Sequence, residues 1–263
     1  NQAPTVNGML AFVSEKKIYD TIKTLSSYPT RHYKSNDGIK SQQFIFDSWQ
    51  ALAANRSDVK VEFFKHKSYG QPSVILTITG SETPNEIVVI GGHADSINQN
   101  WMSSKAPGAD DNASGIATIT EALRLAMLTD YKPKKTVKFM AYAAEEVGLL
   151  GSNDIATAYG KNLVNVVGVV QFDMTGFNGS TQDIVFMTDY TNAAQNKFLQ
   201  SLIDTYIPGV TWGTDKCGYG CSDHASWHAQ GYPASMPFEA KFNDMNHKIH
   251  SDEDTLTTLG DSA

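Results

Sequence analysis

The sequence predicts an α/β protein, a three-layer sandwich in which helices flank a central mixed, largely parallel sheet. Apolar runs rich in β-branched residues alternate with amphipathic stretches of ten or more residues, as in sheets built from crossover connections. The runs at 87–93 and 164–172 are continuously apolar, which is typical of central strands. The 263 residues, 41% of them hydrophobic, suffice for one large core, so we expect a single domain over 1–263.

The elements follow from local patterns. Residues 1–54 carry apolar residues at helical spacing, interrupted by a loop at 26–38 that is rich in Pro, Asn, Asp and Gly. Residues 81–86 predict a turn, and 233–255 a loop-rich segment. The predicted strands are 59–64, 73–79, 87–93, 136–143, 164–172 and 184–188. The predicted later helices are 113–129, a helix entered from the loop within 144–159, and 195–206.

Composition excludes two classes of partner. The net charge is −7, the pI is near 5.4 and the lysines are scattered, so no clustered basic face could bind nucleic acid or an anionic bilayer. No apolar run approaches the roughly 18 residues needed to cross a membrane. We therefore expect neither nucleic-acid nor membrane partners.

Acidic and imidazole groups stand just after the apolar runs. His93, Glu145, Glu146 and Asp173 each follow a predicted strand. Ligands of open α/β sheets bind beyond the carboxyl ends of the strands, where these groups would meet. The pattern predicts one polar site at that edge.

His93 and Asp95 are two residues apart, so on an extended segment both face the same way. The carboxylate could then accept the second N–H of an imidazole that binds a metal ion. For this pair alone, a rim histidine bonded to a neighbouring acid is the commoner arrangement. Asp110 and Asp111 precede small residues that open a helix, where one could cap the helix and the other could bridge a cation.

Glu145 and Glu146 are adjacent at the end of a buried strand, which suits one metal-binding carboxylate and one proton carrier. Two solvated loop acids are the alternative. Asp173 ends a run too apolar to bury an unpaired charge. His250 is the second imidazole that we select, although an exposed loop histidine would look the same.

Other candidates stay open at this point. His224 and His228 are four apart but lack the glutamate context of an HExxH motif. Cys217 and Cys221 fit a local disulfide, half of a metal site or two free thiols.

Five motifs in order resemble a known family. They are GGHADS, PGADDNASG, AYAAEEVGLLGS, QFDMTG and KIHSDEDT. The chain resembles the secreted bacterial zinc aminopeptidases of the M28 clan, most closely the Vibrio-type leucyl aminopeptidase, over nearly its whole length. The resemblance implies the zinc exopeptidase fold, secretion and a monomer that acts on peptides with a free N-terminus.

The resemblance also implies roles for individual residues. Two Zn²⁺ ions would share Asp111, with His250 and Glu146 on one ion and His93 and Asp173 on the other. Glu145 would be the general base, and Asp95 would orient His93.

Further implied roles concern the substrate. Cys217 and Cys221 would form a disulfide that shapes the loop of Tyr219, whose hydroxyl could stabilise the oxyanion. Large apolar first residues would enter a pocket of methionines and phenylalanines, namely Met174, Met187, Phe238, Phe242 and Met245.

Three departures from the family pattern stand out. Asn112 replaces an aspartate of a close relative, which predicts a weaker hold on the substrate amine. Met245 replaces an aromatic residue, and the chain stops at GDSA where the family continues into another helix. Two alternatives to the aminopeptidase remain: a glutaminyl cyclase that uses one zinc on the same scaffold, and a binding domain without catalysis.

Overall fold

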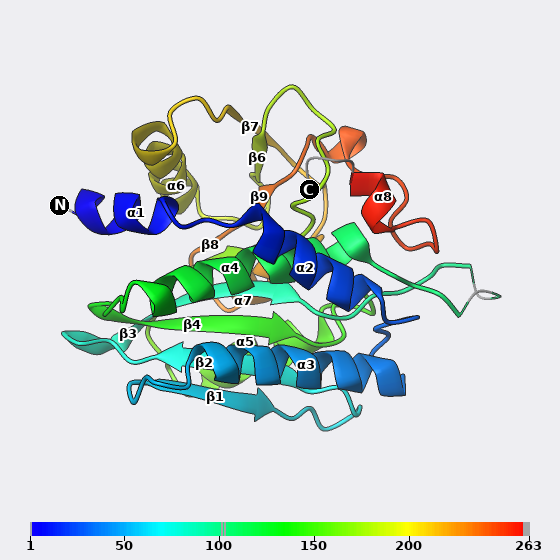
Figure 1. The fold of residues 1–263 in the computed structure, drawn as a ribbon, viewed down its shortest axis with the longest axis horizontal. Helices are drawn as coiled ribbons and strands as arrows, with labels where there is room; N and C mark the ends of the chain where they lie inside the picture. The colour runs from blue at the N-terminus through cyan, green and yellow to red at the C-terminus, as the bar shows by residue number, and fades with distance from the viewer. Residues whose placement is uncertain (1, 101, 103, 260–263) are drawn as a thin grey trace.

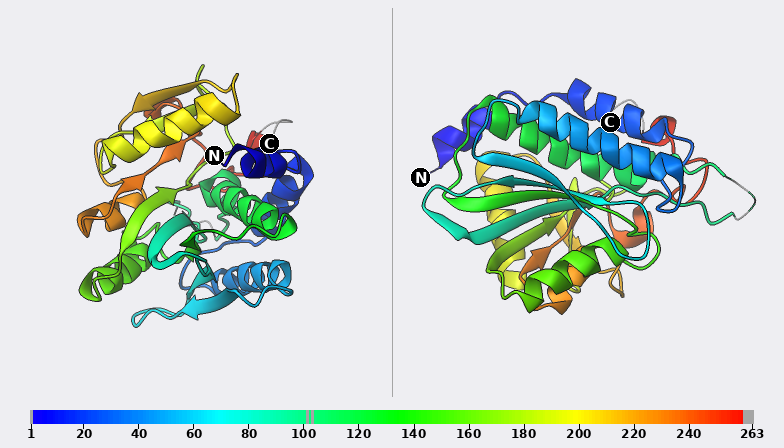
Figure 2. Two further views of the ribbon diagram at one scale, coloured as in Figure 1. Left: turned by 90° about the vertical axis from the view of Figure 1, so that its left-hand side faces the viewer. Right: turned by 90° about the horizontal axis from the view of Figure 1, so that it is seen from below.

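A computed structural model describes residues 2–100, 102 and 104–259 of the chain. A central sheet lies between two helical layers (Figure 1; Figure 2, right), so the predicted three-layer α/β class is confirmed. The sheet is mixed, as predicted.

The central sheet has six strands in the order β1-β2-β4-β3-β5-β8. The strands β4, β3, β5 and β8 are parallel to one another, while β1 and β2 pair antiparallel at one side. Their bounds are β1 Val59–Phe64, β2 Ser73–Ile78, β3 Thr83–His93, β4 Lys135–Tyr142, β5 Val166–Gln171 and β8 Ala234–Ser235. The parallel strands β3, β4 and β5 therefore end at the same edge, as the sequence predicts.

One helical layer packs on the alternating side chains of one sheet face. Val74, Leu76 and Ile78 of β2 join a buried cluster with Trp49 and residues of α2, α3 and α4, whereas Ile75 faces the opposite layer. Strand residues alternate between the two faces, which accounts for this division. This layer includes α2 Glu15–Ser26, α3 Asn36–Leu52 and α4 Gly115–Leu128, which is preceded by the helical turn η1 Ala109–Ser114.

The other layer is built by α5 and α7. Ile155 of α5 and Trp227 of α7 are fully buried with Val89 and Val169 of the sheet. The Trp227 indole N–H donates to the Tyr142 hydroxyl, so the polar group of this aromatic residue is satisfied inside the core. The bounds are α5 Leu150–Lys161 and α7 His224–Ala229.

A smaller three-stranded sheet lies beside the main one. Its order is β7-β6-β9, with bounds β6 Ile184–Met187, β7 Trp212–Asp215 and β9 Pro237–Phe238. The predicted strand at 184–188 is thus present, but it belongs to a second sheet, and part of the expected loop region at 233–255 is strand. The remaining elements are α1 Ala3–Leu10, α6 Ala193–Tyr206, η2 Phe242–Asp244 and α8 Leu256–Leu259.

The helical pattern of residues 1–54 is present, but one detail of it was not foreseen, and the predicted turn at 81–86 is partly wrong. The apolar residues of 9–25 form two helices, because the chain breaks at 11–14 and Ser14 caps α2, which leaves Phe12 more than half exposed. Residues 83–86 are the exposed, irregular start of β3, with a register shift against β4. No helix in the described ranges is long and apolar enough to cross a membrane.

Candidate metal centre and substrate pocket

His93 is the last residue of β3, and Gly91 lies two residues before it on the same strand. A Cβ atom at Gly91 would lie 2.4 Å from the ring of Tyr142 on the neighbouring strand. The missing side chain at Gly91 therefore leaves room for the Tyr142 ring, which packs on this face of the sheet. The Nδ1 atom of His93 lies 3.2 Å from the Asp95 carbonyl oxygen and 3.5 Å from its carboxylate.

The hydrogen bond of the imidazole is with the Asp95 backbone carbonyl, and the Asp95 carboxylate has another role. Its two carboxylate oxygens accept the backbone N–H groups of Glu145 and Glu146, at 2.9 and 3.2 Å. One buried carboxylate thus lies beside His93 and also holds the backbone of the adjacent glutamates. Contacts of this kind fix the orientation of metal ligands.

Asp111 lies in the turn η1, directly before α4, and is joined to Asn112 by a cis peptide bond. The Asp254 carboxylate accepts the backbone N–H groups of Asp110 and Asp111, both at 3.0 Å. Asp254 therefore holds the backbone of η1 where the Asp111 side chain enters the site. Sequence reasoning did not select Asp254, although it lies in the late motif KIHSDEDT.

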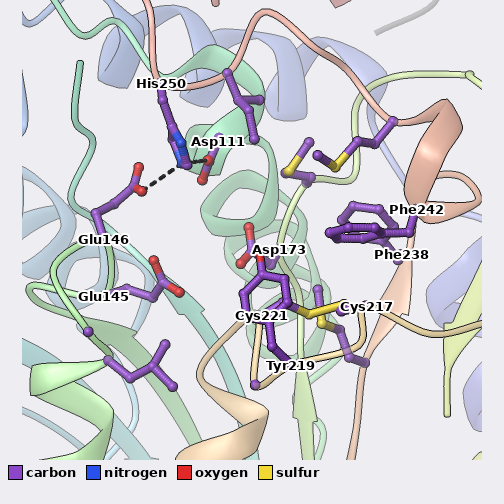
Figure 3. A pocket seen from close by; sticks show the side chains of 17 residues that line it. Asp111, Glu145, Glu146, Asp173, Cys217, Tyr219, Cys221, Phe238, Phe242 and His250 are labelled. Atoms are coloured by element: carbon purple, nitrogen blue, oxygen red, sulfur yellow. Dashed lines mark ion pairs between the residues drawn. A yellow bond between two sulfur atoms is a disulfide. The ribbon is translucent and has the colours of Figure 1, made fainter. Parts of the chain in front are cut away.

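The structure brings the five expected ligands into two groups that share Asp111. Figure 3 shows four of them, Asp111, Glu146, Asp173 and His250, on one side of the cavity. In one group, His93 Nε2 lies 3.0 Å from Asp111 Oδ1 and 3.3 Å from Asp173 Oδ1. In the other group, His250 Nε2 lies 3.1 Å from Asp111 Oδ2 and 2.8 Å from Glu146 Oε2. Asp111 directs one oxygen to each imidazole, as a bridging carboxylate would.

These groups fit zinc. Bonds of about 2.0 Å in a tetrahedron place ligand atoms about 3.3 Å apart, close to the distances in both groups. Within the described ranges, the buried Glu146 Oε1 atom has no hydrogen-bond partner, and a cation bound here could coordinate it. Imidazole and carboxylate are also the donors that zinc prefers in catalytic sites.

The charges of the cluster depend on one another. Burial alone would lower the pKa of His250, but its contacts with Asp111 and Glu146 raise that pKa to about 11. Burial, together with the negative charge of Asp111, raises the pKa of Glu146 to about 8. Protons thus balance the carboxylates of the cluster, a role that a bound cation would take over.

Glu145 faces the same cavity (Figure 3) without belonging to either group. Its Oε2 atom lies 3.9 Å from His93 Nε2. Burial raises the pKa of this carboxyl well above its usual range. A carboxyl group with a raised pKa beside a metal centre can accept and return a proton.

Asn112, not Asp110, has the helix-start role: its Oδ1 atom accepts the backbone N–H group of Gly115, the first residue of α4, at 3.0 Å. Asp110 does not cap α4: it is buried and accepts N–H groups from Gly176 and Asn246. Burial and the charge of Asp254 raise its pKa to about 7. The Asn112 side chain is buried, where it accepts from Met174 N–H and donates to the Phe172 carbonyl, so it is absent from the pocket lining.

One cavity of about 360 Å³ is lined by the carboxylates and by an apolar wall, which forms the pocket. Met174, Phe238, Phe242 and Met245 line it, as expected from the family resemblance. Met187 does not line it: this side chain is fully buried behind the lining, packed with Met174 and Val185.

Sequence reasoning missed Met236 and Ile249, which do line the pocket. Met236 is two residues before Phe238, a spacing that puts both side chains on one face of an extended segment. Ile249 precedes His250 directly. The two-residue spacing of Met236 and Phe238 could therefore have identified Met236 from the sequence.

Cys217 and Cys221 form the expected disulfide. The bond lies in the pocket wall and closes the loop that carries Tyr219 (Figure 3), whose ring packs edge-on against Phe242. The Asp189 carboxylate accepts the backbone N–H groups of Cys217 and Gly218, so the loop has a second attachment.

Two further histidines lie outside the metal groups, and one serine contacts a proposed ligand. His224 and His228 lie on α7 as the spacing allows, but neither belongs to a metal group within the described residues. Ser222, also missed, donates its hydroxyl to Asp173 Oδ2 and so orients that ligand.

Known proteins resemble this chain over nearly its full length. The model of "Peptidase family M28" matches residues 73–263. Leucine aminopeptidase 1 of Arthroderma gypseum is 39% identical over 272 residues, covering 98% of this chain and 72% of the relative. The LapA aminopeptidase of Legionella pneumophila superposes with a TM-score of 0.90 at 32% identity, covering 98% of this chain and 70% of that one. The zinc aminopeptidase BSAP of Bacillus subtilis has the same fold, with a TM-score of 0.78 at 16% identity, over 94% of this chain and 90% of that one.

Proposed function

Because the chain belongs to peptidase family M28, we propose that this metallo-aminopeptidase uses two zinc ions to remove large apolar residues from the N-terminus of peptides. One observation carries the two-ion proposal: two ligand groups share the Asp111 carboxylate, one oxygen each. A likeness to the Vibrio type in particular remains part of the proposal.

His93, Asp111 and Asp173 would hold one ion, and Asp111, Glu146 and His250 the other. When bound, a pair of zinc ions lowers the pKa of water and polarises a carbonyl group. Asp95 beside His93 and Ser222 on Asp173 keep the ligands oriented.

Glu145 would act as general base. It would take a proton from the attacking water and later deliver it to the leaving amine. Its buried position beside His93 and its raised pKa support this role. The Tyr219 hydroxyl would stabilise the oxyanion, since the disulfide loop carries this residue at the pocket mouth.

The pocket accounts for the residue preference. Its wall combines thioether and aromatic side chains, which favour a large apolar first residue such as leucine. The relative from Arthroderma gypseum is named for leucine. The carboxylates beside the pocket would attract the free α-ammonium group and so restrict cleavage to the first residue.

We also propose that the protein is secreted and monomeric. A disulfide persists in oxidising compartments and is rare in the cytosol, and this one lies in the pocket wall. Gel filtration with light scattering would test the monomer directly.

The test is a zinc analysis combined with hydrolysis of leucine amide before and after chelation. We expect about two zinc ions per chain, loss of turnover on chelation, and recovery when zinc is restored. Less than about one ion per chain, or turnover indifferent to the chelator, would overturn the proposal. Cyclisation of an N-terminal glutamine peptide in place of leucine amide hydrolysis would indicate the glutaminyl cyclase instead.

A further inference from the structure

Arg31 is a fully buried arginine in the segment that the sequence marks only as a loop. Its guanidinium group donates to four backbone carbonyl oxygens. These are Ala94 at 2.9 Å, Leu25 at 3.1 Å, Gly108 at 2.9 Å, and Pro107. The planar fork of five N–H groups is thus engaged by carbonyl groups from three separate segments.

Two of these segments carry proposed zinc ligands. Ala94 follows His93 directly, and Gly108 is three residues before Asp111. Gly108 adopts a positive φ, and a Cβ atom there would lie 2.8 Å from the guanidinium. The glycine of the PGADD motif therefore allows the close approach of Arg31.

The backbone of Arg31 extends the same contacts. Its N–H group donates to the Ser96 hydroxyl, which in turn donates to the Ala106 carbonyl. Its carbonyl accepts from the Gln71 amide, whose oxygen accepts the N–H group of Ala144, just before Glu145. Main chain and side chain of one residue thus reach the ends of β3 and β4 and the segment just before η1.

Among the residues that the structure describes, no carboxylate forms an ion pair with the Arg31 guanidinium. Its hydrogen bonds within the described residues go to neutral carbonyl groups. Burial lowers its pKa, while the negative charges of Asp254, Asp95 and Asp111 act in the opposite direction. A buried charge is costly unless something compensates it, and the carboxylates of the site are the available compensation.

We propose that Arg31 is a positioning residue that holds the segments of His93 and Asp111 in register and offsets part of the negative charge of the ligand cluster. The zinc part of this inference rests on the proposed function. A lysine at this position keeps the charge but offers its donors from one point, so it cannot reach four carbonyl groups.

The test compares Arg31→Lys with wild type at a temperature where both are folded. We expect the zinc affinity, measured by competition with a chromogenic chelator, to fall about 10- to 100-fold. In zinc-free protein, we expect faster amide hydrogen exchange confined to residues 94–96 and 106–111.

Arg56→Lys is the matched control. The Arg56 side chain is only 7% exposed and contacts Asp58 and the Tyr131 carbonyl. These partners precede β1 and β4, at the end of the sheet opposite to the ligands. The control should lose stability while keeping its zinc affinity and the exchange rates of 94–96 and 106–111.

Three results decide the matter. Equal zinc affinity and equal local exchange in Arg31→Lys and wild type would overturn the inference. If Arg31→Lys does not fold, Ser96→Ala is measured instead. It should lower the zinc affinity severalfold and speed exchange in the same residues, and failure to do so would also overturn the inference. Absence of zinc from wild type would overturn the proposed function, while the exchange measurement on metal-free protein would still decide the role of Arg31.

Discussion

The polar centre and the apolar pocket share one cavity but are built differently. The centre is supplied by the ends of β3, β4 and β5 and the start of α4, and hydrogen bonds from buried side chains hold its ligands. The pocket wall comes from short elements and loops, namely β9, η2 and the disulfide loop. Four of the five proposed ligands thus lie at strand ends or in η1, with His250 in a loop, whereas the apolar wall comes mainly from short elements and loops.

This difference implies that changes in the centre affect every substrate, whereas changes in the pocket affect the preference among substrates. The largest effect is expected for Glu145→Gln, which keeps the shape of the side chain but removes the base. We expect kcat for leucine amide to fall about 10²- to 10⁴-fold, with zinc content unchanged.

Steady-state kinetics measures the fall in kcat, and metal analysis measures the zinc content. Glu62→Gln on the outer strand β1 is the control, since the ion pair that Glu62 makes among the described residues is with exposed Lys60. Turnover that survives Glu145→Gln with little change would show that another group is the base.

The next effect is a change of preference. Met236→Ala should lower the ratio of kcat/KM for leucine amide over alanine amide about tenfold, because it removes apolar wall from the pocket. Met187→Ala is the matched control: it should leave the ratio unchanged while destabilising the fold by about 2–5 kcal/mol, since it leaves a cavity in the core. If Met187→Ala lowered the ratio and Met236→Ala left it unchanged, Met187 rather than Met236 would form the pocket wall.

The smallest effect is expected for the double variant Cys217→Ser, Cys221→Ser. Asp189 still binds the backbone of Cys217 and Gly218, so the loop should keep most of its position. We expect KM for leucine amide to rise about threefold, equal to about 0.7 kcal/mol, with zinc content unchanged. Loss of zinc would show that the loop also supports the metal centre.

Much of the polar centre was predictable from local sequence. A buried parallel strand is continuously apolar, so a charged residue at its end is conspicuous, as with Asp173 after 164–172. The two-residue spacing of His93 and Asp95 likewise places them on one side of an extended segment. His250, in a loop, was selected from the sequence as a second imidazole, but an exposed loop histidine would look the same, and only the family resemblance implied its role.

The pocket was less predictable, because its lining depends on which side of a short segment faces the cavity. Met187 and Met236 look alike in the sequence, yet the pairing of β6 with β9 buries one and leaves the other on the cavity. Asp110 and Asp111 are also neighbours of one chemical type. Only the direction of the backbone in η1 sends Asp111 to the imidazoles and Asp110 towards Gly176 and Asn246.

By itself, the sequence determined the α/β class, the strands that deliver the ligands and the kinds of donor at their ends, since these follow from local periodicity and from the burial of charge. The tertiary structure alone decided that Arg31 joins segments 63 and 77 residues further along the chain. It also decided that Asp254 holds the backbone at Asp111 from a distance of 143 residues. Such contacts depend on how the layers pack, and no local pattern of residues records that packing.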